Sequence, residues 1–165
     1  GPGIREMLAA LRGRGCRRLF FVHGDLAFHD ARRQVAAVAA ETAAAGLPLA
    51  GTFPGNYSFR SGYGVAAEVL AASHQGDAVF LANDRMAAGF YRWCHERGIA
   101  IPGRIRVAGS DDDYAASLLY PPLSSIHQPR TAMGEAAANL LIDLIEGKTA
   151  SSAQLPAHFV AREST

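Results

Sequence analysis

Short polar side chains follow three of the apolar runs in this sequence. Asn83, Asp111 and Gln128 each stand just after such a run. Asn and Gln side chains both donate and accept hydrogen bonds, and an Asp carboxylate can accept from two hydroxyls at once. This set of side chains suits an uncharged, polyhydroxylated small molecule such as a sugar or a nucleoside, and it lacks the features of a phosphate site.

An aromatic residue completes this set. Tyr57 lies in a predicted loop before a helix, where its ring could offer an apolar face for a ligand to stack on. Simpler roles compete for the neighbouring residues. We expect Asp84 to be a helix N-cap, and at least one of the aspartates at 111–113 to be a cap or a solvated turn residue. Asn83 fits a ligand contact and a structural role about equally well.

Signals for catalysis are weak. The six histidines are scattered without HExxH spacing, and no Cys/His pattern typical of zinc sites occurs. The three consecutive aspartates would suit Mg²⁺, but no phosphate-binding loop accompanies them. Gly109-Ser110-Asp111 lacks the second glycine of a nucleophile elbow. We therefore predict no catalytic residue, no metal site and no cofactor.

The elements that must position these residues alternate along the chain. Short apolar runs predict strands, and alanine-rich segments between them predict helices. The predicted strands cover residues 19–22, 47–53, 78–82, 105–108, 123–127 and 155–161, and the predicted helices cover residues 4–11, 31–45, 59–73, 84–97 and 131–146. This order predicts an α/β fold with an open parallel sheet flanked by helices. Ligands of such sheets bind outside the carboxyl ends of the strands, where the polar residues fall.

Composition limits the classes of protein that remain. The chain has 165 residues, a size typical of one domain, with 49% hydrophobic residues and a formal net charge of +1. It therefore lacks the strongly basic surface of a nucleic-acid binder. No apolar run is long enough to cross a membrane. Two cysteines fit a reducing compartment, so we expect a cytoplasmic location. The sequence starts without a signal peptide or an initiator Met, and we expect it to begin partway through a longer protein.

Four ordered motifs resemble those of the LacI/GalR family of bacterial transcription regulators. They lie at residues 77–89 (DAVFLANDRMAAG), 98–112 (GIAIPGRIRVAGSDD), 121–129 (PPLSSIHQP) and 155–165 (LPAHFVAREST). The resemblance implies that residues 1–165 are a fragment of an effector-binding domain with a periplasmic-binding-protein-like (type I) fold. Residues 4–128 and 150–165 would form its C-terminal subdomain. The crossover and helix at 129–149 would belong to an otherwise missing N-terminal subdomain, although their apolar pattern alone predicts core packing.

The resemblance also implies roles for individual residues. Asn83 and Asp111 match the family's hydroxyl-binding positions, Gln128 a polar residue at the crossover, and Tyr57 a stacking aromatic. Gln34 stands where the family usually has an arginine that binds the ligand. Dimer contacts would come from the helix after the Asn-Asp pair and from the segment before Pro-Pro, which places Met86, Phe90, Leu118 and Tyr120 at the interface.

The predicted function is the effector-sensing and dimerisation part of a LacI/GalR-type regulator. A small sugar or nucleoside would bind in a cleft and control operator binding. The contact with operator DNA would come only from an N-terminal helix-turn-helix that lies outside this sequence, and the partner would be a second copy of the chain, with no membrane involved. A solute-binding protein of a sugar transport system with the same fold is the alternative, and a small α/β enzyme is a third possibility.

Overall fold

A single six-stranded sheet forms the centre of the computed structural model, which describes residues 1–149, 151–152 and 154–165. The strands are β1 (Leu19–His23), β2 (Leu49–Pro54), β3 (Ala78–Leu81), β4 (Arg106–Asp111), β5 (Ser124–His127) and β6 (His158–Val160). Their order is β2-β1-β3-β4-β5-β6. All neighbouring pairs are parallel except β5 and β6, which are antiparallel. The predicted open α/β sheet is confirmed.

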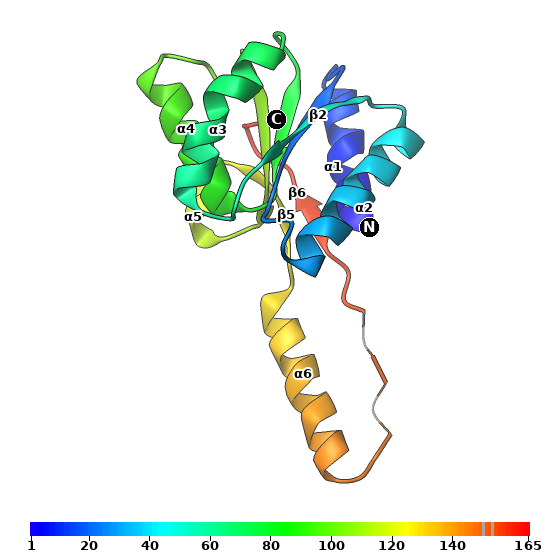
Figure 1. Cartoon of the computed structure of the whole chain (residues 1–165). Helices are drawn as coiled ribbons and strands as arrows, with labels where there is room; N and C mark the ends of the chain where they lie inside the picture. The colour runs from blue at the N-terminus through cyan, green and yellow to red at the C-terminus, as the bar shows by residue number, and fades with distance from the viewer. Residues whose placement is uncertain (150, 153) are drawn as a thin grey trace.

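Helices cover both faces of this sheet. They are α1 (Pro2–Gly13), α2 (His29–Ala45), α3 (Phe59–Ala72), α4 (Asp84–Glu96), α5 (Tyr114–Leu118) and α6 (Arg130–Ile145). Helices α1 and α2 lie on one face, and α3 and α4 lie together on the other (Figure 1). All of them were predicted except the short α5. Within the described residues, no helix is both long enough and apolar enough to cross a membrane.

The core forms around strands β1 and β3. Every residue of these two strands is buried, as their unbroken apolar sequences predict for strands covered on both faces. The rings of Phe21 and Phe80 stack across the pair, with their centroids 5.2 Å apart. Strand β2, at the edge, alternates half-buried and exposed residues instead. The loops that leave the carboxyl ends of these strands therefore start directly from the core.

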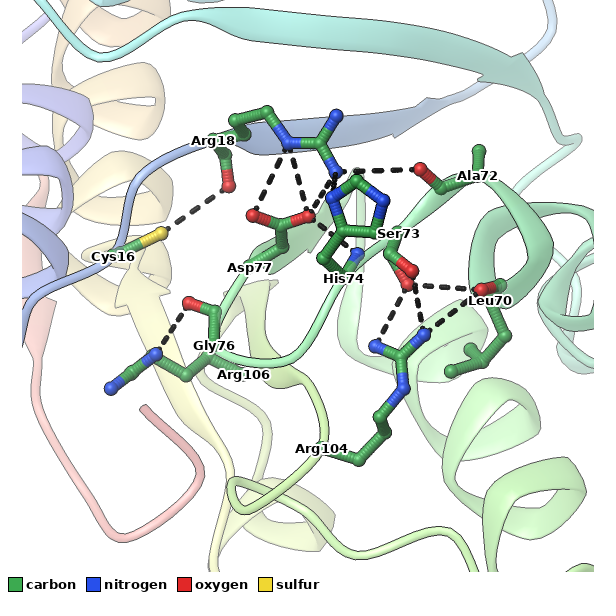
Figure 2. Close-up of polar contacts among 10 residues, drawn as sticks. All are labelled: Cys16, Arg18, Leu70, Ala72, Ser73, His74, Gly76, Asp77, Arg104 and Arg106. Atoms are coloured by element: carbon green, nitrogen blue, oxygen red, sulfur yellow. Dashed lines mark hydrogen bonds and ion pairs between the residues drawn. The ribbon is translucent and has the colours of Figure 1, made fainter.

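Polar side chains close the opposite, amino edge of the sheet (Figure 2). The buried Asp77 carboxylate accepts hydrogen bonds from the Arg18 guanidinium at 2.6 Å and from the His74 backbone N–H at 2.8 Å. Nearby, Arg104 donates to the carbonyls of Leu70 and Ser73 at the end of α3. These groups satisfy one another within the chain, so this edge has a structural role.

Helix α6 projects away from the rest of the molecule (Figure 1). Every residue of α6 is at least partly exposed. Several large apolar side chains are exposed along it, namely Met133, Leu141, Ile142, Leu144 and Ile145. The core packing predicted for this helix from its apolar pattern is therefore wrong within this chain.

Candidate functional site

Three of the predicted site residues lie along one edge of the sheet. Strands β3, β4 and β5 are neighbours and run parallel, so the residues at their carboxyl ends come together. These residues are Asn83, Asp111 and Gln128. The Gln128 side-chain amide donates to Asp111 Oδ1 at 3.1 Å. Asn83 lies at the end of the adjacent strand β3. The structure thus places the three polar side chains on one shared edge, as expected from the sequence.

Asn83 also caps a helix. Its Oδ1 accepts a hydrogen bond from the Met86 backbone N–H at 2.9 Å, which makes Asn83 the N-cap of α4. Its Nδ2 donates to the Tyr57 carbonyl at 3.1 Å. The prediction that Asp84 is the cap is therefore wrong, since Asp84 is the first residue of the helix. An amide has two N–H donors and two acceptor positions, so Asn83 retains capacity for a ligand.

The loop that carries Asp111 has an unusual backbone. Asp111 and Asp112 have backbone φ values of 115° and 54°. Residues other than glycine rarely adopt positive φ values. Burial raises the pKa of Asp111, and the positive charge of Arg130 opposes this shift. Arg130, the first residue of α6, also donates to the Asp111 carbonyl at 3.1 Å. The Asp111 carboxylate therefore lies where the chain leaves the sheet for α6.

The three consecutive aspartates have different partners. Asp112 receives a hydrogen bond from Arg162 at 2.7 Å and lies 3.0 Å from the Nδ1 atom of His127. Asp113 pairs with Arg130. Among the described residues, no group of three His, Cys, Asp or Glu side chains is arranged to hold a metal ion. Of the three carboxylates, that of Asp111 is the one that pairs with Gln128 at the carboxyl edge of the sheet.

Tyr57 lies against the end of β1. A Cβ atom added to Gly24 would come within 1.9 Å of the Tyr57 Cζ atom, so the ring rests directly on this glycine. Burial raises the pKa of Tyr57, with smaller contributions from the negative charges of Asp30, Asp111 and Asp25. The ring therefore lies within the electrostatic field of Asp111, at the same edge of the sheet. Gly24 was missed at the sequence level as a residue that makes room for this ring.

Gln34 lines a cavity beside the edge. Its Nε2 lies 3.5 Å from the Ala82 carbonyl. The cavity has a volume of about 170 Å³, and Gln34 shares it with Gln128, Pro2 and Ala157. Three segments that are distant in the sequence therefore meet here, namely the start of α1, the exit from β5 and the return to β6. Gln34 and Gln128 are close enough to line the same small space.

Asp84 was not recognised as part of this site from the sequence. Asp84 is 4% exposed, and its carboxylate accepts hydrogen bonds from Ser125 Oγ at 2.6 Å and from the Asp113 backbone N–H at 2.8 Å. Burial raises the pKa of Asp84 to about 6. The sequence offered no local signal for this role, and the fit of Gly109 around Asp84 is seen only in the structure, where a Cβ atom at Gly109 would come within 2.2 Å of Asp84 Oδ1.

Known proteins are similar to this chain over most of its length. The family of periplasmic binding protein-like domains matches residues 8–165. The ribose operon repressor of Escherichia coli K12 is 32% identical over 144 residues, which are 86% of this chain and 44% of that protein. The chain belongs to the LacI/GalR family. It spans less than half the length of this repressor.

Solved structures of LacI/GalR proteins have the same fold. A dimeric lac repressor with a C-terminal deletion superimposes with a TM-score of 0.90 at 27% identity, over 99% of this LacI/GalR chain and 60% of that one. A complex of the transcriptional regulator CelR with cellobiose gives a TM-score of 0.87 at 29% identity, over 99% and 51% of the two chains. The similarity includes α6, since nearly the whole chain is aligned.

The dimer surface predicted for this LacI/GalR chain needs correction at two residues. Met86 and Phe90 are fully buried in the core of the chain, on the side of α4 that packs inward, so neither can contact a partner directly. Leu118 and Tyr120 are 66% and 88% exposed. The helical spacing of Met86 and Phe90 marks an apolar face of α4, and the sequence alone did not show that this face packs on the sheet.

Proposed function

We propose that this chain is the effector-sensing and dimerisation part of a LacI/GalR-type transcription regulator. Its ligand is a small, uncharged, polyhydroxylated molecule of the sugar or nucleoside class. The observation that carries the proposal is the hydrogen-bonded pair of Asp111 and Gln128 at the carboxyl edge of the sheet. Asp111 accepts ligand hydroxyls, Gln128 and Asn83 donate and accept, and Tyr57 provides an apolar ring face.

The second half of the cleft comes from a further subdomain. In this proposal residues 4–128 and 150–165 form one subdomain, and residues 129–149 belong to the other. Positions 150 and 153 lie outside the described residues. The exposed apolar side chains of α6 support this division, because an apolar helix face of this size is normally covered.

Ligand binding between the two subdomains acts on the regulator by shifting the balance between an open and a closed arrangement. The free energy of this shift can be no larger than the difference in ligand-binding free energy between the two arrangements. Arg130 is well placed to respond, because it begins α6 and contacts the loop of Asp111. Leu118 and Tyr120 contribute to a homodimer contact, through which the change reaches a helix-turn-helix outside this sequence that binds operator DNA.

The named relatives support a sugar more directly than other ligands. One is the repressor of a ribose operon, and another was solved as a complex with cellobiose. The relatives are transcription regulators, which favours a non-catalytic protein in the cytoplasm over the solute-binding protein of a transport system. Gln34 stands in place of an arginine, and its neutral amide fits an uncharged ligand.

The experiment is a thermal-unfolding screen of the full-length regulator. A panel of D-ribose, D-glucose, lactose, cellobiose, adenosine and guanosine is added to the wild type and to the Asp111→Ala variant. A ligand that binds the folded state raises the midpoint of unfolding. We expect at least one compound to raise the midpoint of the wild type and to leave that of Asp111→Ala unchanged. An equal rise in both proteins would remove Asp111 from the site.

A further inference from the structure

A buried carboxylate lies directly behind the binding edge. Asp84 receives hydrogen bonds from the Ser125 hydroxyl at 2.6 Å and from the Asp113 backbone N–H at 2.8 Å. A carboxylate this buried is unfavourable unless its oxygens are well bonded. Asp84 is not needed to cap α4, because the neighbouring Asn83 does so. One bond of Asp84 instead reaches the loop that carries Asp111, and the other reaches Ser125 on the neighbouring strand β5.

This loop needs support from its surroundings. Asp111 and Asp112 both have positive φ values, and such conformations persist only where the rest of the structure fixes them. Ser125 Oγ donates to Asp84 and also accepts from the Asp112 backbone N–H at 3.1 Å. The backbone amides of Asp112 and Asp113 are therefore both held by Asp84, the first through Ser125 and the second directly.

The neighbouring strand is shaped around the same carboxylate. A Cβ atom at Gly109 would lie 2.2 Å from Asp84 Oδ1 and 2.9 Å from a methyl group of Leu123. Only glycine leaves room for the carboxylate at this position. Three elements thus converge on Asp84, since α4 supplies the group, β5 supplies the Ser125 hydroxyl, and β4 supplies the space.

The protonation state of Asp84 decides how many hydrogen bonds its carboxyl group can accept. Asp84 faces the carboxylates of Asp111 and Asp113, which raise its pKa, and it lies in the field of the Arg130 guanidinium. Burial is the largest cause of the raised pKa. The ionised carboxylate accepts from both of its partners, whereas a protonated or amidated group has a donor in place of one acceptor. Loss of one acceptor would release one of the two amides of the loop.

We propose that Asp84 is a positioning residue that holds the loop 111–113, so that the Asp111 carboxylate faces the ligand. The part of this inference that concerns the ligand rests on the proposed function. The part that concerns the loop depends only on the contacts of Asp84. The two parts can therefore be tested separately.

The test is hydrogen–deuterium exchange with mass spectrometry on the full-length regulator, for the wild type and Asp84→Asn. The Asn side chain has the same shape but can accept from only one of the two partners. We expect the amide of either Asp112 or Asp113 to exchange at least tenfold faster in the variant, because Asn keeps one of the two acceptors. We also expect the affinity for the panel compound that stabilises the wild type to fall about tenfold. The thermal midpoint should not fall, because a buried charge is removed.

Asp77→Asn is the matched control. Asp77 is also a buried carboxylate, but it lies at the opposite edge of the sheet and pairs with Arg18 (Figure 2). We expect this variant to lower the thermal midpoint while leaving both the exchange of the 111–113 loop and the affinity at wild-type values. Ser125→Ala should accelerate exchange of the Asp112 amide, since this amide loses its acceptor.

Each outcome decides between the claims. Loop exchange in Asp84→Asn within twofold of the wild type would overturn the positioning role. Equal acceleration in Asp77→Asn would also overturn it, because the effect would then be general destabilisation. Faster loop exchange in Asp84→Asn, together with unchanged panel binding in Asp111→Ala, would support the positioning of the loop and reject the proposed function.

Discussion

The Gln128 side chain donates a hydrogen bond to Asp111 Oδ1 at 3.1 Å. This bond joins the end of β5 to the end of β4. Figure 1 shows the chain continuing from β5 into α6. The bond also fixes which oxygen of Asp111 is occupied by the chain itself. The pair therefore orients both side chains before any ligand arrives, which reduces the entropy lost on binding.

Replacing Gln128 tests this relationship. We expect Gln128→Ala in the full-length regulator to weaken binding of the panel compound that stabilises the wild type by about tenfold, equivalent to about 1.4 kcal/mol. The reason is that a hydrogen-bonding group is lost and the Asp111 side chain is no longer oriented. Isothermal titration calorimetry provides the measurement. Gln75→Ala is the control, since Gln75 is exposed and its side chain contacts the Gly103 carbonyl at the other edge of the sheet. Equal affinities for the two variants would contradict the account.

Gly24 tests the placement of the Tyr57 ring. We expect Gly24→Ala to displace the ring, because the added Cβ atom would come within 1.9 Å of Cζ, and to weaken ligand binding in the same titration. Gly64→Ala is the control, because an alanine at this position should stabilise the fold. Gly64 lies within α3 with open space around it, so alanine there should raise the free energy of unfolding by up to about 1 kcal/mol. Wild-type binding in Gly24→Ala would exclude a role for the ring.

Asp84 makes stability depend on pH. Its pKa is raised from 3.8 to about 6 in the folded chain, so the folded state binds the proton more tightly than the unfolded state. The stability that this group contributes is complete below about pH 3.8 and is lost as the pH rises through about 6, a change of ~3 kcal/mol. Urea unfolding of wild type and Asp84→Asn from pH 4 to 7.5 measures it. We expect the wild type to lose stability relative to the variant as the pH rises, and parallel curves would contradict the raised pKa.

The buried and exposed residues of the predicted dimer surface should respond differently to substitution. Met86→Ala should lower the free energy of unfolding by about 2–5 kcal/mol, because it leaves a cavity in the core. Tyr120→Ser should leave the stability of the monomer nearly unchanged and weaken the dimer, as measured by sedimentation equilibrium of the full-length regulator. Tyr120→Ser with an unchanged dimer dissociation constant would remove this residue from the interface.

The fold could be predicted from sequence because the apolar runs are unambiguous. The uninterrupted apolar sequences of β1 and β3 predict strands buried on both faces, and both strands are fully buried. Glycines also marked helix ends correctly, as at Gly46, which has a left-handed backbone and ends α2. The parallel order then placed Asn83, Asp111 and Gln128 at one edge, since each follows a neighbouring strand.

The local roles of polar residues were harder to predict. Asn83 and Asp84 are both good N-cap residues, and sequence does not say which of two neighbours has the extended backbone of a cap. In the structure Asn83 is the cap, and Asp84 turns inward to Ser125. That contact joins residues 41 positions apart, so no local pattern reveals it. The apolar pattern of α6 similarly indicates a covered face without indicating which chain segment covers it.

The most direct test of the account is a crystal structure of the full-length regulator with the panel compound that stabilises it. We expect the compound to lie between the carboxyl edge of the sheet and the second subdomain, with one hydroxyl within hydrogen-bond distance of the Asp111 carboxylate and another near Gln128. A compound bound elsewhere on the protein, with Asp111 and Gln128 still paired only with each other, would contradict it.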